Sequence, residues 1–124
     1  MIGDFRSPDL HYTGWLEQVT ETNELRIVSP KHRSVFLSAL GANKKEIIVE
    51  GTVSKGTIGK ILVIVRTDRD YPQALGKAHT DGTWSFSGID LGGVDHQLYA
   101  VLVDENDTPL YRSSVITVRL ERRT

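Results

Sequence analysis

The sequence predicts an all-β protein, an antiparallel β-sandwich of about seven strands. Short apolar runs recur along most of the chain and are separated by breaks rich in Gly, Asp and Pro. Two of these runs, 61–65 and 98–103, are apolar on both faces, as strands in the middle of a sheet are. No run keeps the period of a convincing helix. Such strands need an opposite sheet, because a lone hairpin is barely stable in water.

The chain is long enough for one domain preceded by an arm. With 124 residues and 39% hydrophobic residues it can bury a modest core. Residues 1–24 are polar and irregular, and we expect them to form an N-terminal arm or linker. Residues 25–124 carry the strand pattern and are expected to form the sandwich domain. In the arm, Leu10–Trp15 could add a short strand, and Trp15 either packs onto the sandwich or marks a contact with a partner.

Successive segments have the composition and alternation of strands. The first ends at a Ser-Pro pair, which suits a strand end because Pro has no N–H to donate. For the second, a strand is favoured over a helical turn because the run is short and a Gly closes it. In the third, Ile47, Val49, Gly51 and Val53 share one face. The expected strands are 25–28, 34–40, 46–53, 60–66, 74–79, 83–87, 96–103 and 114–120, with loops at 88–95 and 104–109.

The segment Ala78–Phe86 predicts a tight hairpin. Asp81-Gly82 between extended segments is a strong hairpin signal, since Gly tolerates the positive φ that such turns need. The alternation that follows places Trp84 and Phe86 on one face and serines on the other. We therefore expect a hairpin that fixes strand register and inserts both aromatic rings into the core.

Composition excludes several classes of function. Fifteen basic and 16 acidic residues leave a net charge of −1, which gives no electrostatic case for nucleic acid or an anionic membrane surface. The absence of cysteine removes disulfides, zinc–thiolate sites and thiol nucleophiles. No apolar run approaches the roughly 20 residues that span a bilayer, and the first residues do not resemble a signal peptide. The compartment stays open between the cytoplasm and a domain of a longer exported protein.

No catalytic or metal-binding constellation is recognisable, so we expect no enzyme activity and no cofactor. The four histidines lack metal-ligand spacing, and the chain has no Gly-x-Ser-x-Gly elbow. Carboxylates, which calcium prefers as ligands, cluster at 68–70 and at 104–107. If strands 60–66 and 97–103 are antiparallel neighbours, the two clusters lie at opposite poles. Each cluster is then expected to be a solvated turn in which Asp and Asn cap the backbone.

Four segments resemble bacterial immunoglobulin-like repeats. The first, Arg26–Pro30, is an opening strand that ends in Ser-Pro, and the second, Ile47–Val53, contains a Gly-Thr step. The third, Asp81–Phe86, begins with Asp-Gly-Thr-Trp, and the fourth, Tyr99–Asn106, includes a strand that ends in Asp. The resemblance covers about residues 25–120 and implies an immunoglobulin-like fold, although the usual Gly before Asn106 is missing. The Gly-Thr-Val step, the Thr-Asp-Gly turn and a Gly-Gly loop also look like the transthyretin-like regulatory domain of carboxypeptidases. Both families are β-sandwiches without catalytic residues.

The expected function is that of a non-catalytic immunoglobulin-like module, a structural spacer or a protein-interaction or adhesion domain in a larger protein or assembly. The alternative is a carbohydrate-binding module that uses exposed aromatic side chains. Recognition is expected from the loops 54–60 and 104–109 at one pole. The expected partner is a protein or a neighbouring domain, and the arm could also pair with a sheet edge of its own or of a second copy. The candidate binding residues are Trp15, Tyr71, Tyr111, Asp104 and Asn106.

Overall fold

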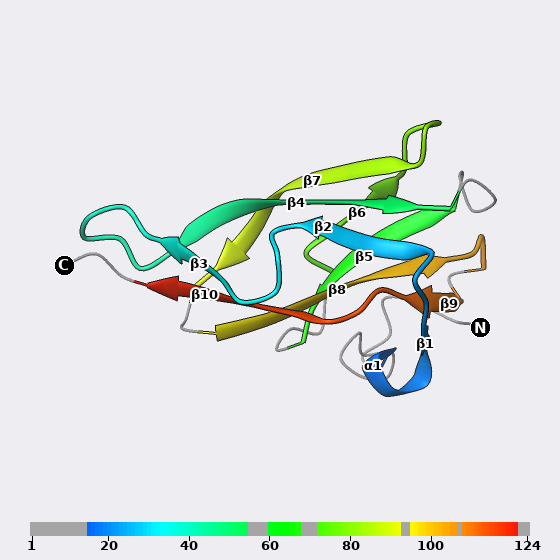
Figure 1. The fold of residues 1–124 in the computed structure, drawn as a ribbon, viewed down its shortest axis with the longest axis horizontal. Coiled ribbons are helices and arrows are strands. Elements are labelled where there is room, and N and C mark those ends of the chain that lie inside the picture. Colours follow the sequence, from blue (N-terminus) through cyan, green and yellow to red (C-terminus); the bar gives the residue numbers. More distant parts are fainter. Residues whose placement is uncertain (1–14, 55–59, 68–71, 93–94, 107, 122–124) are drawn as a thin grey trace.

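Two β-sheets pack face to face in the computed structural model, which describes residues 15–54, 60–67, 72–92, 95–106 and 108–121 (Figure 1). The large sheet is built from β1 (Thr20–Glu21), β3 (Ser34–Leu37), β5 (Ile61–Arg66), β6 (Ala74–Lys77), β8 (Asp95–Val103), β9 (Pro109–Arg112) and β10 (Ile116–Glu121). The small sheet is built from β2 (Leu25–Ser29), β4 (Lys45–Val53) and β7 (Thr83–Leu91). One helical turn, α1 (Trp15–Gln18), precedes β1.

Strand order places β4 at the centre of the small sheet and β8 at the centre of the large one. β4 pairs antiparallel with β2 and β7. β8 pairs antiparallel with β5 on one edge, and β9 and β10 follow one another along its other edge. β1 and β3 then add parallel strands outside β9 and β10. The predicted antiparallel β-sandwich is confirmed, and the described residues form ten strands rather than about seven.

The main core lies between the two sheets and is formed by alternate residues of the long strands. In β4, Ile47, Val49 and Val53 are buried and the residues between them are exposed, except for the buried Gly51, as the alternation predicted. Two sheets that bury one face each against the other are the stable form of such strands. The other deeply buried members are Leu25, Leu62, Ile64, Trp84, Ile89, Leu91, Leu98, Ala100, Leu102, Ile116, Val118 and Leu120.

A second apolar cluster covers the outer face of the large sheet, and it explains why two strands are apolar on both faces. It combines the outward side chains of β5 and β8 with one residue that precedes β1: Val63, Val65, Tyr99, Val101, Val103 and Val19. Leu16 of α1 packs against this cluster. The segment from α1 to β1 therefore lies against the large sheet and shields it from water.

Arg112 fastens this N-terminal segment to β9. Its Nε donates a hydrogen bond to the carbonyl oxygen of Leu16 at 3.3 Å, and its Nη1 lies 3.5 Å from Oε1 of Glu21. The backbone N–H of Thr22 donates to the carbonyl of Arg112 at 2.9 Å. The pairing of the arm with its own sheet is therefore seen at β1.

The turn at Asp81-Gly82 forms, but the predicted hairpin is wrong. Gly82 has a φ of 88°, and its N–H donates to the carbonyl of His79 at 2.9 Å. The strands on either side lie in different sheets, because β6 pairs with β5 whereas β7 pairs with β4. The carbonyl of Gly82 accepts a hydrogen bond from the N–H of Val53 at 2.8 Å, so the chain enters the small sheet directly from the turn.

Several strand boundaries also differ from the prediction, and one strand in this region was not predicted. β7 continues to Leu91, past the expected end at residue 87, because a bulge at Gly88 with a φ of 75° keeps the strand in register with β4. β9 lies between the predicted turn and the predicted last strand. β3 ends at Leu37 rather than Leu40. The one described helix, α1, is too short to cross a membrane.

Candidate functional site

Several turns gather at one end of the sandwich, which we call the loop pole and which comprises residues 22–24, 79–82, 104–106 and 108. β5 begins where β8 ends, since Ile61 lies opposite Val103. The N–H of Ser54 donates to the carbonyl of Glu24 at 2.9 Å, which joins the end of β4 to the turn between β1 and β2. The predicted meeting of the loops 54–60 and 104–109 is seen at their described ends, and residues 55–59 lie outside the described part of the chain.

Asp104 caps the turn that follows β8. Its Oδ1 accepts hydrogen bonds from the backbone N–H of Asn106 at 2.8 Å and of Thr108 at 3.0 Å. Its own N–H donates to the carbonyl of Thr108 at 3.0 Å. These bonds commit one carboxylate oxygen to the backbone, as Asp does in many turns, and leave the side chain of Asn106 exposed.

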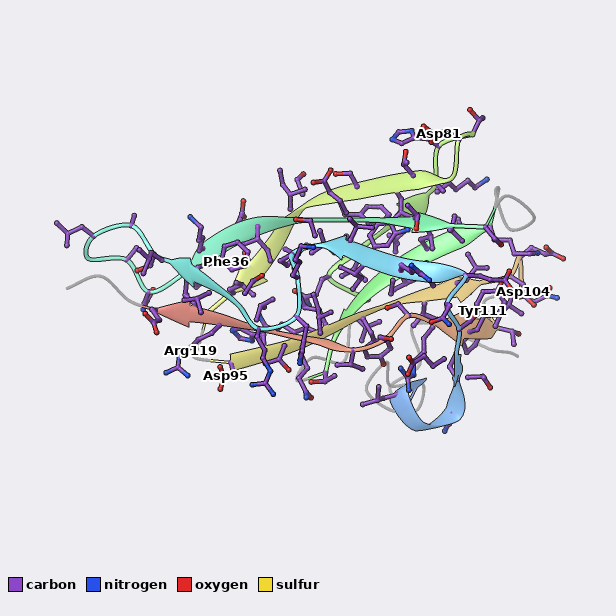
Figure 2. All side chains as sticks on the ribbon, viewed as in Figure 1. Phe36, Asp81, Asp95, Asp104, Tyr111 and Arg119 are labelled. Atoms are coloured by element: carbon purple, nitrogen blue, oxygen red, sulfur yellow. The ribbon has the colours of Figure 1, made fainter. Side chains whose placement is uncertain are left out.

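Asp81 caps a second turn at the same pole, and Figure 2 shows both labelled carboxylates at this end of the molecule. Its Oδ1 accepts from the hydroxyl of Thr83 at 2.7 Å and from the N–H of Thr83 at 3.0 Å. The hydrogen bond from the Thr83 hydroxyl, followed by that from its N–H, holds the pKa of Asp81 below the ordinary value of 3.8. Asp81 was not among the binding residues predicted from the sequence, although an Asp two positions before a Thr at a turn is a signal for such a cap.

The structure does not bring all five predicted residues together. Asp104 and Asn106 share one turn, whereas Tyr111 lies in β9, half-buried between the two apolar clusters. The backbone of Trp15 begins α1, but its side chain lies outside the described part, as does all of Tyr71.

The two strands that precede the predicted carboxylate clusters, β5 and β8, end at opposite ends of the sandwich. β5 and β8 are antiparallel neighbours, as the sequence analysis supposed, with Arg66 opposite Leu98 at one end and Ile61 opposite Val103 at the other. Residues 68–70 follow β5 and lie outside the described part. Within the described ranges, no three His, Asp or Glu side chains are placed to hold a metal ion.

Of the two aromatic residues after the Asp-Gly turn, Trp84 is a core residue, as predicted, and Phe86 is half-buried against the core. Trp84 is only 2% exposed, and its ring centroid lies 5.7 Å from that of Phe86. Gly51, directly opposite Trp84 on β4, leaves the space that the indole ring occupies, and Gly76 on β6 does the same for Phe86. Trp84 is therefore no platform for stacking a sugar.

A groove of about 200 Å³ opens between β2 and the segment that leads into β10. Its lining combines an apolar floor with a polar rim: Leu25, Ile27, Ile116, Thr22, Asn23, Arg26 and Ser114. Within the polar rim, Nε of Arg26 donates a hydrogen bond to the carbonyl oxygen of Asn23 at 3.0 Å. Pockets for small molecules usually measure about 300–1,000 Å³, so this groove does not favour a small-molecule site.

Arg66 is a buried charged residue that the sequence analysis missed. It ends β5, is 2% exposed, and its Nη1 donates to the carbonyl of Asp90 on β7 at 2.6 Å. The bond joins the large sheet to the small one at the end opposite the loop pole. In the sequence, the only sign of this bond between the sheets is the position of an Arg at the end of an apolar strand.

Comparisons with known proteins identify the fold. No family model matches the sequence, and no curated protein matches it. Among solved structures, the fibronectin(III)-like modules of Clostridium thermocellum CbhA are similar, with a TM-score of 0.57 and 11% sequence identity over 81% of this chain and 99% of that chain. The chain has a fibronectin III-like fold. Such folds are β-sandwiches of the immunoglobulin class, so the predicted fold class is confirmed, while the narrower assignment to bacterial immunoglobulin-like repeats stays a prediction.

Proposed function

We propose that the chain is a non-catalytic module that acts as a spacer or as a protein-interaction or adhesion domain, and that its contacts are made by the loop pole. The observation that carries this proposal is the pair of capped turns at Asp104 and Asp81. Both caps fix the backbone before any partner arrives, and a preformed surface loses less conformational entropy on binding. Loops held by a rigid sandwich are a common place for recognition.

The exposed side chains of these turns fit a protein partner better than a substrate. Thr80 and Asn106 are exposed at the pole and are not ionisable, while the carboxylates of Asp81 and Asp104 accept hydrogen bonds from backbone N–H groups. A general acid or base needs a carboxylate that is free to exchange its proton with a substrate. The similar CbhA structures are described as modules, which supports a role within a larger protein.

The carbohydrate-binding alternative lacks a matching surface in the described part of the chain. A sugar platform needs an exposed aromatic face. Trp84 is buried, and Phe36, Phe86 and Tyr111 are all half-buried against the core. No observation favours this alternative, so we do not propose it.

Site-specific photo-cross-linking tests the proposed function. A photoreactive amino acid at Asn106 should form an adduct with one defined protein or neighbouring domain in the cell of origin. The same amino acid at Ser85, an exposed position on the outer face of the small sheet, is the matched control and should not. Equal labelling from both positions would contradict recognition by the loop pole. Turnover of any hydrolase substrate that is lost in Asp104→Asn would overturn the non-catalytic assignment.

A further inference from the structure

β3 is an open edge of the large sheet with an apolar surface. It is the last strand beyond β10, and none of the described strands pairs with its other side. Val35 and Leu37 point to the outer face and are 54% and 53% exposed, and Leu40 just beyond the strand is 72% exposed. An edge strand presents unpaired N–H and C=O groups that can pair with another strand. On its open side, β3 therefore presents backbone N–H and C=O groups that can pair with another strand, together with exposed apolar side chains whose burial would be favourable.

The other open edges in the described part of the chain carry features that discourage pairing, and β3 does not. β2 has the exposed Arg26 and a register shift after Ile27. β7 is bent by the bulge at Gly88. β6 ends in the exposed Lys77, and β1 has only two residues. Charges, bulges and very short strands are the usual protection of sheet edges, whereas the sequence of β3, Ser-Val-Phe-Leu, contains no charge, Gly or Pro.

We propose that β3 pairs antiparallel with β3 of a second copy of this chain. A two-fold axis through Phe36 makes the two edges run antiparallel and places Val35 of one copy opposite Leu37 of the other, twice over. All four exposed apolar side chains then find cross-strand partners. Phe36 is half-buried at the margin of the main core, and the same pairing brings it beside its equivalent on the inner face.

The charges beside β3 are arranged to tolerate this pairing. In the register of β3 and β10, Arg119 lies next to Val35 and Glu121 next to Leu37. Each row across the joined sheets therefore runs from a cation, through two apolar residues, to an anion. Arg119 already lies 3.5 Å from Glu121 and 3.6 Å from Asp95, so its charge is balanced within one copy. Pairing brings no two like charges opposite one another, which would oppose it.

The dimer should be weak and concentration-dependent. Two four-residue strands and a few side chains bury less than the roughly 1,200 Å² of a stable standard interface. The surface also lies at the end of β8 remote from the loop pole, as Figure 2 shows for Phe36 and Arg119 against Asp104. The pairing therefore does not depend on the proposed function.

Sedimentation velocity over a concentration series tests the pairing. The weight-average mass should rise from the monomer value toward twice that value as the protein is concentrated from about 10 μM to 1 mM. Val35→Lys places a charge on the free edge and should keep the protein monomeric throughout. Ile48→Lys is the matched control, because Ile48 is also 54% exposed but lies on β4 in the small sheet. A monomer at every concentration, or a Val35→Lys variant that associates like the wild type, would overturn the proposal.

A cross-linking experiment tests the register independently, because the chain has no cysteine of its own. Directly opposite residues have Cβ atoms about 4.5–5.5 Å apart, within reach of a short thiol-to-thiol cross-linker. An equimolar mixture of Val35→Cys and Leu37→Cys chains should give mixed dimers in clear excess over the dimers that either variant forms alone. Ile48→Cys should give only the background of random collision. Yields from the mixture no higher than that background would overturn the two-fold register.

Discussion

Replacing Gly51 with alanine should remove a large part of the protein's stability, because the new methyl group has no room. Gly51 sits at the centre of the small sheet, opposite Ile27 of β2 and Trp84 of β7. A Cβ atom there would lie 1.9 Å from the carbonyl oxygen of Arg26 and 2.3 Å from Cζ2 of Trp84. Both neighbours would have to move, and one of them is the backbone of the adjacent strand.

The magnitude follows from how far these neighbours must move. Ordinary contact begins at 3.4 Å, so β2 must shift by about 1.5 Å, the difference between 3.4 and 1.9 Å. Overpacking of a core usually costs about 1–3 kcal/mol, and a displaced strand together with a displaced indole places this case at about 3 kcal/mol. That is a large share of the roughly 5–15 kcal/mol that stabilises a domain. For a domain of this size it corresponds to a fall in Tm of about 12 °C.

Urea unfolding measures the effect directly. The midpoint should fall with little change in the m-value, and Gly92→Ala is the matched control, because its Cβ would meet only Cγ of Lys44, at 3.9 Å. Combining Gly51→Ala with Trp84→Phe should cost less than the sum of the two single changes, since the smaller ring relieves one of the two contacts. A Gly51→Ala variant whose free energy of unfolding lies within about 1 kcal/mol of that of the Gly92→Ala control would show that Gly51 is not sterically required.

Three further predictions concern buried or capped polar groups. Arg66→Met removes the hydrogen bond to the Asp90 carbonyl and should lower the free energy of unfolding by about 1.5–3 kcal/mol, measured by urea unfolding; an unchanged midpoint would show that the bond between the sheets adds nothing. The pKa of Asp81 is lowered in the folded state, so its stabilisation is present above the unfolded value of 3.8 and is lost as the pH falls through the lower folded value. The Tm of the wild type should therefore exceed that of Asp81→Asn at pH 5, and the gap should close toward pH 2. Burial raises the pKa of Tyr99 from 10.0 to about 12, so this residue favours the fold below pH 10 and the contribution is lost as the pH rises toward 12. The tyrosinate absorbance of folded wild type minus that of Tyr99→Phe should accordingly show no titration step near pH 10.

The sequence predicted those parts of the fold that depend on which side chains of a single strand are apolar and which are polar. β4 shows every second residue buried, and the apolar run in β5 indicated a strand covered on both faces. Trp84 could be assigned to the core because its neighbours in the strand are small and polar. The turn at Asp104 was predicted for the same reason, since Asp and Asn cap the backbone within two or three residues of themselves.

The parts that the sequence did not predict depend on partners far away in the chain. The Asp-Gly turn specifies a reversal, but only the packing of β7 on β4 decides that it crosses between sheets. Arg112 holds a segment more than 90 residues before it, and Arg66 reaches the backbone of β7 across the sandwich. The candidate site was predicted least well, because its three aromatic residues were each chosen singly, and only the fold decides which turns meet at one pole.

The positions of the two proposed surfaces have a joint consequence. The loop pole lies where β8 ends, and β3 pairs with β10 beside the start of β8, so the surfaces occupy opposite ends of the sandwich (Figure 1). Two copies joined through β3 would therefore direct their loop poles away from each other. A weak dimer of this form becomes a bivalent ligand, whose second contact is favoured by a high effective concentration when two partner sites are close enough to be spanned. Because its two loop poles face opposite directions, the dimer should bridge two separate partner-coated surfaces rather than bind one surface twice. At high concentration the wild type should therefore agglutinate beads that carry the partner and Val35→Lys should not, although both contact the partner through the same unaltered turns.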